Sequence, residues 1–162
     1  MGPGSRPRPM PRIRLEPTLE MAREMAPNLR AADVLEVHRA GRHTPLQALE
    51  LGLEGTRNGF WIEHEGEPVA IGGSCPVPGG DRVECPWMLG TDFITHHRVW
   101  FLRHTPEIWA TVERDYRFLW NMVDARNYDH VRWLQWSGCT FTGERELNGN
   151  PFLEFVKICA SP

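Results

Sequence analysis

The sequence predicts an α+β protein whose sheet is mixed, mainly antiparallel, and carries helices on both faces. Two observations lead to this fold class. Apolar residues recur about every 3.6 positions up to residue 55 and about every 2 positions from residue 60. Later, the apolar and aromatic run 118–123 precedes a helical pattern that Gly138 ends, and a second strand-like run begins there. A strand, a helix and a strand in this order form a βαβ-like unit, which packs a helix against a sheet.

The first eleven residues differ in composition from the rest of the chain. Residues 1–11 are rich in proline, glycine and arginine, so we expect them to form a flexible tail. Residues 12–162 are expected to form a single domain, because 162 residues is an ordinary domain size. The tail could be an arginine-bearing arm for an acidic partner, but disorder without a role is the favoured interpretation.

The composition argues against several classes of function. A formal net charge of −3 disfavours bulk electrostatic binding of nucleic acid or membranes. No apolar run approaches the roughly 18 residues of a membrane span, and the N-terminus lacks the apolar core of a signal peptide. We therefore expect neither a membrane span nor a nucleic-acid partner.

The cysteines and histidines give no sign of a metal site. Cys75, Cys85, Cys139 and Cys159 form no CxxC pair, and the histidines, His130 among them, are scattered along the chain. Each cysteine lies in or beside a strand-like run, where a free cysteine behaves as a small apolar residue. We expect reduced, buried and inert thiols, as in cytosolic proteins.

Helical patterns occupy residues 17–55. The first helix begins at Thr18 and stops at Pro27, since proline cannot continue the hydrogen-bond ladder of a helix. The second is expected to begin with Asn28 as its N-cap and to end at Gly41.

The third helix has the strongest local signal. Thr44 is its expected N-cap and Pro45 its first residue, and Gln47 completes a capping box. We expect Gly52 and Gly55 to break this helix, because glycine is a poor helix former.

Strand patterns follow. Residues 60–64 and 68–75 flank a Glu-Gly turn and are predicted to form a hairpin, and residues 83–89 form a third strand. The next helical region contains Pro106, which is expected to kink or split it, with Thr105 as a new N-cap.

The last third of the chain contains the βαβ-like unit. Asn127 is expected to cap its helix, and of Trp133 and Trp136 one should face the sheet while the other forms an exposed partner-binding surface. Residues 143–151 are interpreted as a polar turn region, and residues 152–158 as the final strand.

This order of elements, together with Asn127 and Gly138, resembles the GCN5-related N-acetyltransferase (GNAT) superfamily. In that family a strand is followed by a helix that opens with Asn, and a Gly-Phe step leads into the next strand. Asn127 and Gly138 match that Asn and that Gly, and Val131 and Trp133 match apolar positions of the helix. The resemblance covers residues 13–158 and implies acyl transfer to an amine, with acetyl-CoA as the cofactor.

The chain also resembles a family of small GNAT-like proteins that T7-like tailed bacteriophages encode. The matching segments are residues 30–37, 45–50, 86–92 and 119–127, with Trp133-Leu134. Members of that family are described as assembly or internal-virion proteins. The resemblance implies other phage structural proteins or a host protein as partners, and the virion or the host cytoplasm as the location.

The chain departs from GNAT enzymes at two chemical positions. Those enzymes hold the coenzyme A pyrophosphate in a loop with two glycines, whereas the loop here has Gly90 alone and places the negative charge of Asp92 beside it. Many also carry a Tyr general acid seven residues after the Asn, and that position here is Leu134, which cannot donate a proton. The residue after Gly138 is Cys139, where the family has Phe.

The most concentrated polar chemistry lies at residues 90–98, directly after a central strand. Asp92 or His97 could act as a general base that deprotonates an amine. Alternatively, Thr91 or Asp92 caps the following helix, which is the favoured interpretation. The two roles are compatible, because one carboxylate can perform both. The GNAT resemblance implies five cofactor-binding positions: Leu89, Gly90, Thr91, Asn127 and Trp133.

The sequence thus leads to two hypotheses about function. The first is a phage-encoded protein that keeps the acyltransferase fold but serves as a virion-associated or assembly factor. The alternative is an active acyl-CoA-dependent N-acetyltransferase that modifies a host or phage protein.

Overall fold

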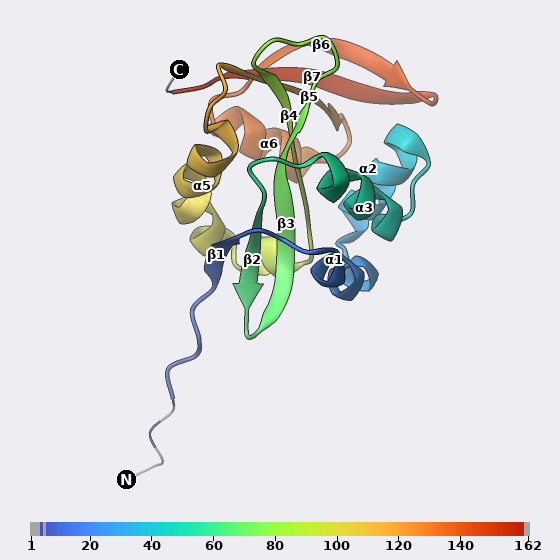
Figure 1. Cartoon of the computed structure of the whole chain (residues 1–162). Coiled ribbons are helices and arrows are strands. Elements are labelled where there is room, and N and C mark those ends of the chain that lie inside the picture. The colour runs from blue at the N-terminus through green and yellow to red at the C-terminus, as the bar shows by residue number, and fades with distance from the viewer. Residues whose placement is uncertain (1–3, 5, 161–162) are drawn as a thin grey trace.

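The computed structural model describes residue 4 and residues 6–160. A seven-stranded sheet lies at its centre, with the strands in the order β1-β2-β3-β4-β5-β7-β6 (Figure 1). All neighbouring strands are antiparallel except β4 and β5, which are parallel. This confirms the predicted fold class. The strands are β1 (Arg12–Leu15), β2 (Phe60–His64), β3 (Glu67–Pro76), β4 (Val83–Gly90), β5 (Phe118–Asp124), β6 (Thr140–Leu147) and β7 (Asn150–Ile158).

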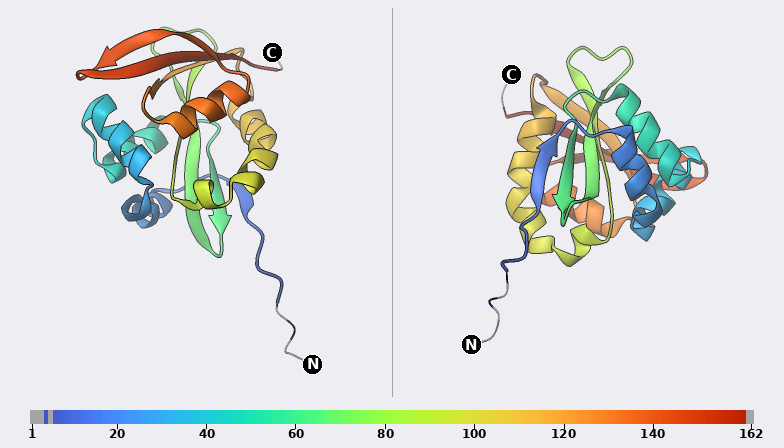
Figure 2. Two further views of the ribbon diagram at one scale, coloured as in Figure 1. Left: turned by 180° about the vertical axis from the view of Figure 1, so that it is seen from behind. Right: turned by 60° about the horizontal axis from the view of Figure 1, so that its bottom comes forward.

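Helices cover both faces of the sheet (Figure 2). Helices α1, α2 and α3 pack on one face, and α4, α5 and α6 pack on the other. No helix in the described part of the chain combines the length and hydropathy that a membrane crossing requires. The α-helices are α1 (Leu19–Met25), α2 (Ala31–Gly41), α3 (Pro45–Gly55), α4 (Phe93–His96), α5 (Arg98–Glu113) and α6 (Tyr128–Trp136).

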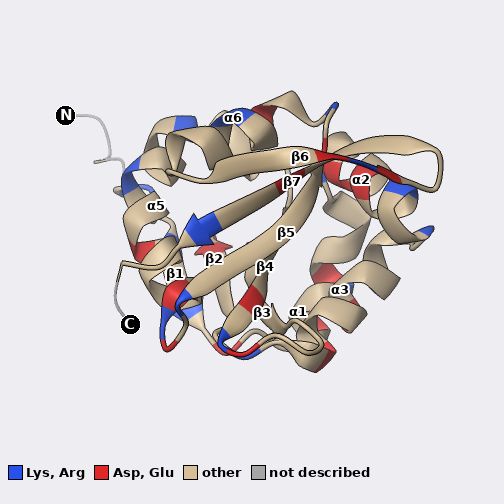
Figure 3. Cartoon of the chain, turned by 90° about the horizontal axis from the view of Figure 1, so that it is seen from above, with Lys and Arg blue, Asp and Glu red and all other residues tan. Residues whose placement is uncertain are grey.

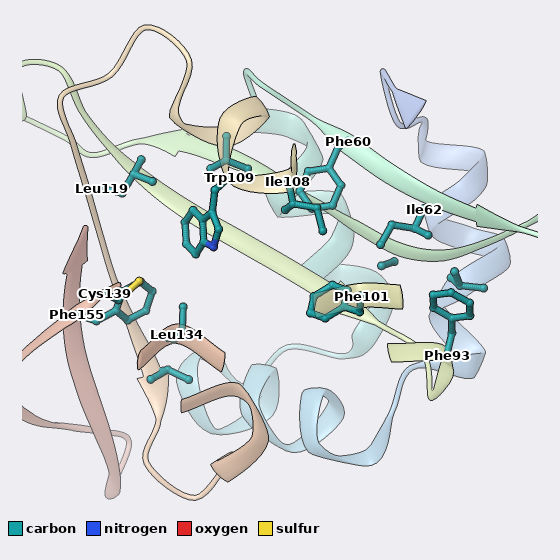
Figure 4. Packing of buried hydrophobic residues seen from close by; sticks show 14 of the residues in the cluster. Phe60, Ile62, Phe93, Phe101, Ile108, Trp109, Leu119, Leu134, Cys139 and Phe155 are labelled. Atoms are coloured by element: carbon teal, nitrogen blue, oxygen red, sulfur yellow. The ribbon is translucent and has the colours of Figure 1, made fainter. Parts of the chain in front are cut away.

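Each face has its own buried core. On the α5–α6 face, Phe101, Trp109 and Leu134 pack with Leu119 and Phe155 of the sheet (Figure 4). On the opposite face, buried side chains of α1 and α3 pack against β3. Full burial of one such side chain stabilises the fold by roughly 1.5–3 kcal/mol, so these clusters fix the positions of the helices.

Local sequence signals account for the start of α3 but not for the start of α2. The Thr44 hydroxyl accepts a hydrogen bond from Gln47 N–H and the Gln47 side chain accepts one from Thr44 N–H, which confirms the capping box. The expected N-cap role of Asn28 is wrong. Ala26–Asn28 continue α1 as a short 3₁₀ turn, Leu29 then pairs with Thr91, and α2 begins only after Arg30.

Two expected helix breaks do not occur. Helix α3 continues through Gly52. The Trp87 ring of β4 packs directly against this glycine, which has no side chain, so Gly52 permits close packing between α3 and the sheet. Helix α5 continues through Pro106, and Thr105 is not a cap: its hydroxyl donates to the Phe101 carbonyl within the helix. The helical region is instead divided at His97, between α4 and α5.

The expectation of a polar turn region at residues 143–151 is wrong. Strands β6 and β7 run through it as a hairpin, and Asn148 and Gly149, both at positive φ, form the connection. Strand β6 lies at the edge of the sheet and its residues are mostly exposed, so its polar sequence lacks the apolar alternation of a half-buried strand. The Asn148 side chain donates to the Arg39 and Ala40 carbonyls at the end of α2.

Candidate functional site

The central feature of the structure is a gap between β4 and β5. The two strands pair only at Val83 with Phe118 and at Glu84 with Leu119, and then separate. The Asn121 side chain bridges the start of the gap, because its Nδ2 donates to the Pro86 carbonyl at 2.7 Å. Beyond this bridge, β4 presents peptide groups that no strand pairs.

Most of these peptide groups are already bonded within the protein. Gly90 N–H donates to the Asp33 carboxylate at 2.9 Å, and Gly90 C=O accepts from Arg30 N–H at 3.0 Å, so the peptide groups of Gly90 point away from β3. Peptide groups alternate in direction along a strand, so those of Pro86 and Met88 point the same way, into the gap. Pro86 has no N–H, and Asn121 occupies its carbonyl. Met88 is therefore the position along this edge that can still pair with an extended ligand.

A cavity of about 380 Å³ passes through the gap. Its walls include Leu51 and Trp87 on the α3 face, and Ile108 and Trp109 on the α5 face. A second cavity, of about 360 Å³, lies between α4, α5 and α6. Both cavities are mostly apolar, and they share Met88, His130 and Trp133, so they adjoin at the gap.

A polar cluster lies where the cavities meet. The Glu36 carboxylate of α2 accepts a hydrogen bond from Asn127 Nδ2 at 2.6 Å and one from Asp124 N–H at 3.2 Å. His130 Nδ1 lies 3.7 Å from the Glu36 Oε2 atom, and both side chains line the first cavity. Burial favours the neutral form of Glu36, but the nearby His130 imidazole and the hydrogen bonds from Asn127 and Asp124 outweigh it and lower the pKa of Glu36.

Further ion pairs tie α2 to the sheet around this cluster. Asp124 is buried and lies 2.8 Å from Arg39 and 3.4 Å from Arg126. Burial opposes the charge of Asp124, but the bonds from Arg39 and Arg126 lower its pKa. Asp33, also buried, pairs with Arg30 at 2.9 Å. The carboxylates of Glu36 and Asp124 are thus held ionised by the protein's own donors.

The predicted cofactor-binding residues divide into two groups. Leu89, Gly90 and Thr91 lie at the end of β4, where Thr91 N–H donates to the Val69 carbonyl and Gly90 is bonded as described. Trp133 lines both cavities, stacks on Trp109 with ring centroids 5.4 Å apart and donates to Thr105 Oγ1.

Asn127 does not cap α6 with its side chain, although it occupies the N-cap position. Its Nδ2 bonds Glu36, and its Oδ1 accepts from Arg30 at 3.3 Å. The sequence interpretation of this side chain as a cap is therefore wrong, because Glu36 of α2 and Arg30, which directly precedes α2, compete for it.

The predicted catalytic residues lie away from both cavities. Asp92 is exposed and makes no capping bond, and the Thr91 hydroxyl accepts from Phe93 N–H instead. His97 stacks on Phe93 with centroids 4.3 Å apart and lies 4.9 Å from the His64 ring. Neither Asp92 nor His97 lines the cavities, so their catalytic roles stay predictions.

Sequence reasoning missed Glu36 and His130. His130 follows Asn127 by three residues, which places both on one side of α6, and this spacing was an available signal. Glu36 gave no signal, because it lies on a different helix 91 positions before Asn127. Among the residues that the structure describes, no group of three His, Cys, Asp or Glu could hold a metal ion.

The strand order and the gap between β4 and β5 define a protein with the fold of GNAT acetyltransferases. Solved structures with this fold include the ribosomal-protein-S18-alanine N-acetyltransferase from Escherichia coli, with a TM-score of 0.67 and 13% identity over 94% of this chain and 96% of that chain. Ard1 from Thermoplasma volcanium has a TM-score of 0.70 and 12% identity over 93% and 99%. AAC(6')-Ib, in complex with ribostamycin and coenzyme A, has a TM-score of 0.62 and 18% identity over 91% and 93%.

These identities establish the fold alone. A family model described as "Bacteriophage T7, probable scaffold protein Gp13" matches residues 58–145, more than half of the 162-residue chain. The chain therefore belongs to that family. A comparison with curated proteins finds no match.

Proposed function

We propose that this protein is a bacteriophage assembly factor that uses the acyltransferase fold as a scaffold and does not transfer acyl groups. Its family, described as a probable scaffold protein of bacteriophage T7, supports a role in building the virion. Its partners are then other phage structural proteins, and its location is the virion or the cytoplasm of the infected cell.

The observation that carries this proposal is the occupied edge of β4. An extended ligand arm that pairs with a strand needs successive free peptide groups. Here the Gly90 peptide groups are bonded to Asp33 and Arg30, and the Pro86 carbonyl is bonded to Asn121. Met88 alone fits such an arm, so the residues beside the gap fit an acyl-CoA cofactor poorly.

The junction between β4 and α4 is equally unsuited to a pyrophosphate. Its N–H groups would have to face the anion, but Thr91 N–H donates to Val69 O, Phe93 N–H to Thr91 Oγ1 and Ile94 N–H to Thr91 O. The exposed carboxylate of Asp92 adds repulsion at the same place.

Two measurements test the proposal. Isothermal titration with acetyl-CoA and a turnover assay on a panel of amines should give neither micromolar binding nor product. Deletion of the gene from the phage that encodes it should give incomplete or non-infectious particles, and normal infectious particles from that deletion would refute the assembly role.

The alternative is an acetyl-CoA-dependent N-acyltransferase that acts on a host or phage protein. The cavity through the gap favours this alternative. Met88 lines it, and so do His130 and Glu36, which lie 3.7 Å apart. His130, oriented by Glu36, could take a proton from an amine that lies in the cavity. If turnover is found, its loss in Glu36→Gln but not in Asp92→Ala or His97→Ala would place the base in the gap, and the reverse pattern would place it at the end of β4.

A further inference from the structure

The second cavity opens between two helices that both carry arginine. This α5–α6 groove is formed by Ile94, Arg98 and Leu102 on one wall and by Arg132, Trp133 and Trp136 on the other. Figure 2 shows α6 beside α5 on the face opposite α1 and α3, and Figure 3 shows basic residues on both helices. The groove is thus distinct from the cavity that passes through the sheet, although the two adjoin.

The charge of the groove is positive. Arg98 and Arg132 are exposed, and neither forms an ion pair within the described part of the chain. The Arg30 guanidinium also lines the groove, and its Nε is buried without a hydrogen-bond partner among the described residues. The acidic groups here are Asp129 and Asp33, and Asp33 already forms an ion pair with Arg30 and accepts a hydrogen bond from Gly90 N–H.

The groove also presents a large aromatic surface. Trp133 faces the sheet and stacks on Trp109, whereas Trp136 is 60% exposed, as the sequence predicted for one of the two. Tryptophan and arginine are the residue types that most often dominate binding energy at protein interfaces. An exposed tryptophan that lines the same groove as two unpaired arginines indicates a contact surface for an anionic, partly apolar segment.

Local geometry favours carboxylates over a nucleotide as the anion. At the start of α4 the Phe93 and Ile94 N–H groups donate to Thr91, and the Ile94 side chain fills the space directly above Gly90, so these two groups form no cradle for a phosphate. The arginine side chains that line the groove carry guanidinium groups, whose planar forks match carboxylates in pairs of parallel hydrogen bonds.

We propose that the α5–α6 groove docks an acidic segment of another protein. One apolar or aromatic side chain of that segment packs against Trp136, and flanking Asp or Glu side chains bond Arg98 and Arg132. The inference rests on the proposed assembly function and names the chemistry of the partner's docking segment.

The test begins with selection of a random 12-residue peptide library on the folded full-length protein. Selected peptides should be enriched in Asp or Glu beside Leu, Phe or Trp. One selected peptide and its version with every acidic residue changed to the amide are then titrated by fluorescence anisotropy. The amide version, the double variant Arg98→Gln/Arg132→Gln and the variant Trp136→Ala should each bind at least about tenfold more weakly. Arg23→Gln, at an exposed position of α1 outside the groove, should bind as the wild type does.

Several results would overturn the docking proposal. The first is a selection that enriches no peptide, or that enriches basic or uncharged peptides. The second is a double variant that unfolds at the wild-type temperature and binds the peptide as tightly as the wild type does. The third is coenzyme A that displaces the peptide in a way that depends on the same arginines. The proposed function is judged separately by the gene deletion. If the phage assembles normally with Arg98→Gln/Arg132→Gln but fails to assemble without the gene, the docking role of the groove is refuted and the proposed assembly function is supported.

Discussion

Asn127 Nδ2 donates a hydrogen bond of 2.6 Å to the Glu36 Oε2 atom and joins the start of α6 to α2 across the open edge of β5. A residue that the sequence marks as a helix cap thus serves as a tertiary link. The link holds Glu36 beside His130, where the two cavities meet. The same contact determines what several substitutions should do.

Asn127→Ala should destabilise the protein by about 1–3 kcal/mol, because it removes a donor from a carboxylate that is mostly buried. Urea denaturation measures the change. Gln135→Ala, at an exposed position of the same helix, is the matched control and should change the free energy of unfolding by less than about 0.5 kcal/mol. Equal stability of Asn127→Ala and the wild type would contradict the tertiary role of Asn127.

Glu36 should make the fold sensitive to acid. Because its pKa is lowered in the folded state, its carboxylate stabilises the protein above the unfolded pKa of about 4.3, and this contribution is lost as the pH falls through the folded pKa. The free energy of unfolding should therefore fall between about pH 5 and pH 3, and fall less in Glu36→Gln. A variant with the same pH slope as the wild type would show that other carboxylates carry the effect.

Glu84 should behave in the opposite way. Burial raises its pKa, the Arg57 charge offsets only part of this, and Glu84 Oε2 has no hydrogen-bond partner among the described residues. The charged form therefore costs stability above the folded pKa, and this cost disappears as the pH falls below the unfolded pKa. Glu84→Gln should raise the thermal midpoint at pH 7, with a gain that shrinks toward pH 4. A lower midpoint at pH 7 would mean that the Arg57 pairing outweighs the burial of Glu84.

Gly72→Ala should destabilise the central sheet by about 1–3 kcal/mol. A Cβ at this position would lie 2.5 Å from the Trp87 backbone oxygen and 2.8 Å from the Phe60 ring, and a backbone atom cannot move aside easily. Gly143→Ala in edge strand β6 is the control, since nothing lies within 4 Å of its Cβ position. Chemical denaturation should separate the two variants, and similar losses would contradict the steric argument.

The thiols should be unreactive in the folded protein. Burial raises the pKa of Cys85 to about 12 and that of Cys139 to about 11, and only the thiolate is nucleophilic. At pH 8 about one Cys85 thiol in ten thousand is ionised. Mass spectrometry should find these residues alkylated by iodoacetamide far more slowly in buffer than in denaturant, and equal rates would contradict their raised pKa values.

Elements with a strong local signal were predictable from the sequence. The capping box of Thr44 and Gln47 and the helix stop at Gly138, whose φ is +90°, need only neighbouring residues. Pro106 misled the prediction, because a helix packed along its length tolerates one missing hydrogen bond. Strand β6 misled it because an exposed edge strand has no apolar alternation.

The sequence by itself determined the element order, the α+β class and the resemblance to acyltransferases, because these depend on local periodicity and short motifs. The tertiary structure decided what lies beside the gap in the sheet. Only the tertiary structure shows that Asp33 accepts a hydrogen bond from Gly90 N–H, that Glu36 accepts one from Asn127, and that Arg98 and Arg132 line one groove. These contacts join residues that are far apart in the chain and make no pattern within a window of sequence, and the chemistry that the protein can perform depends on them.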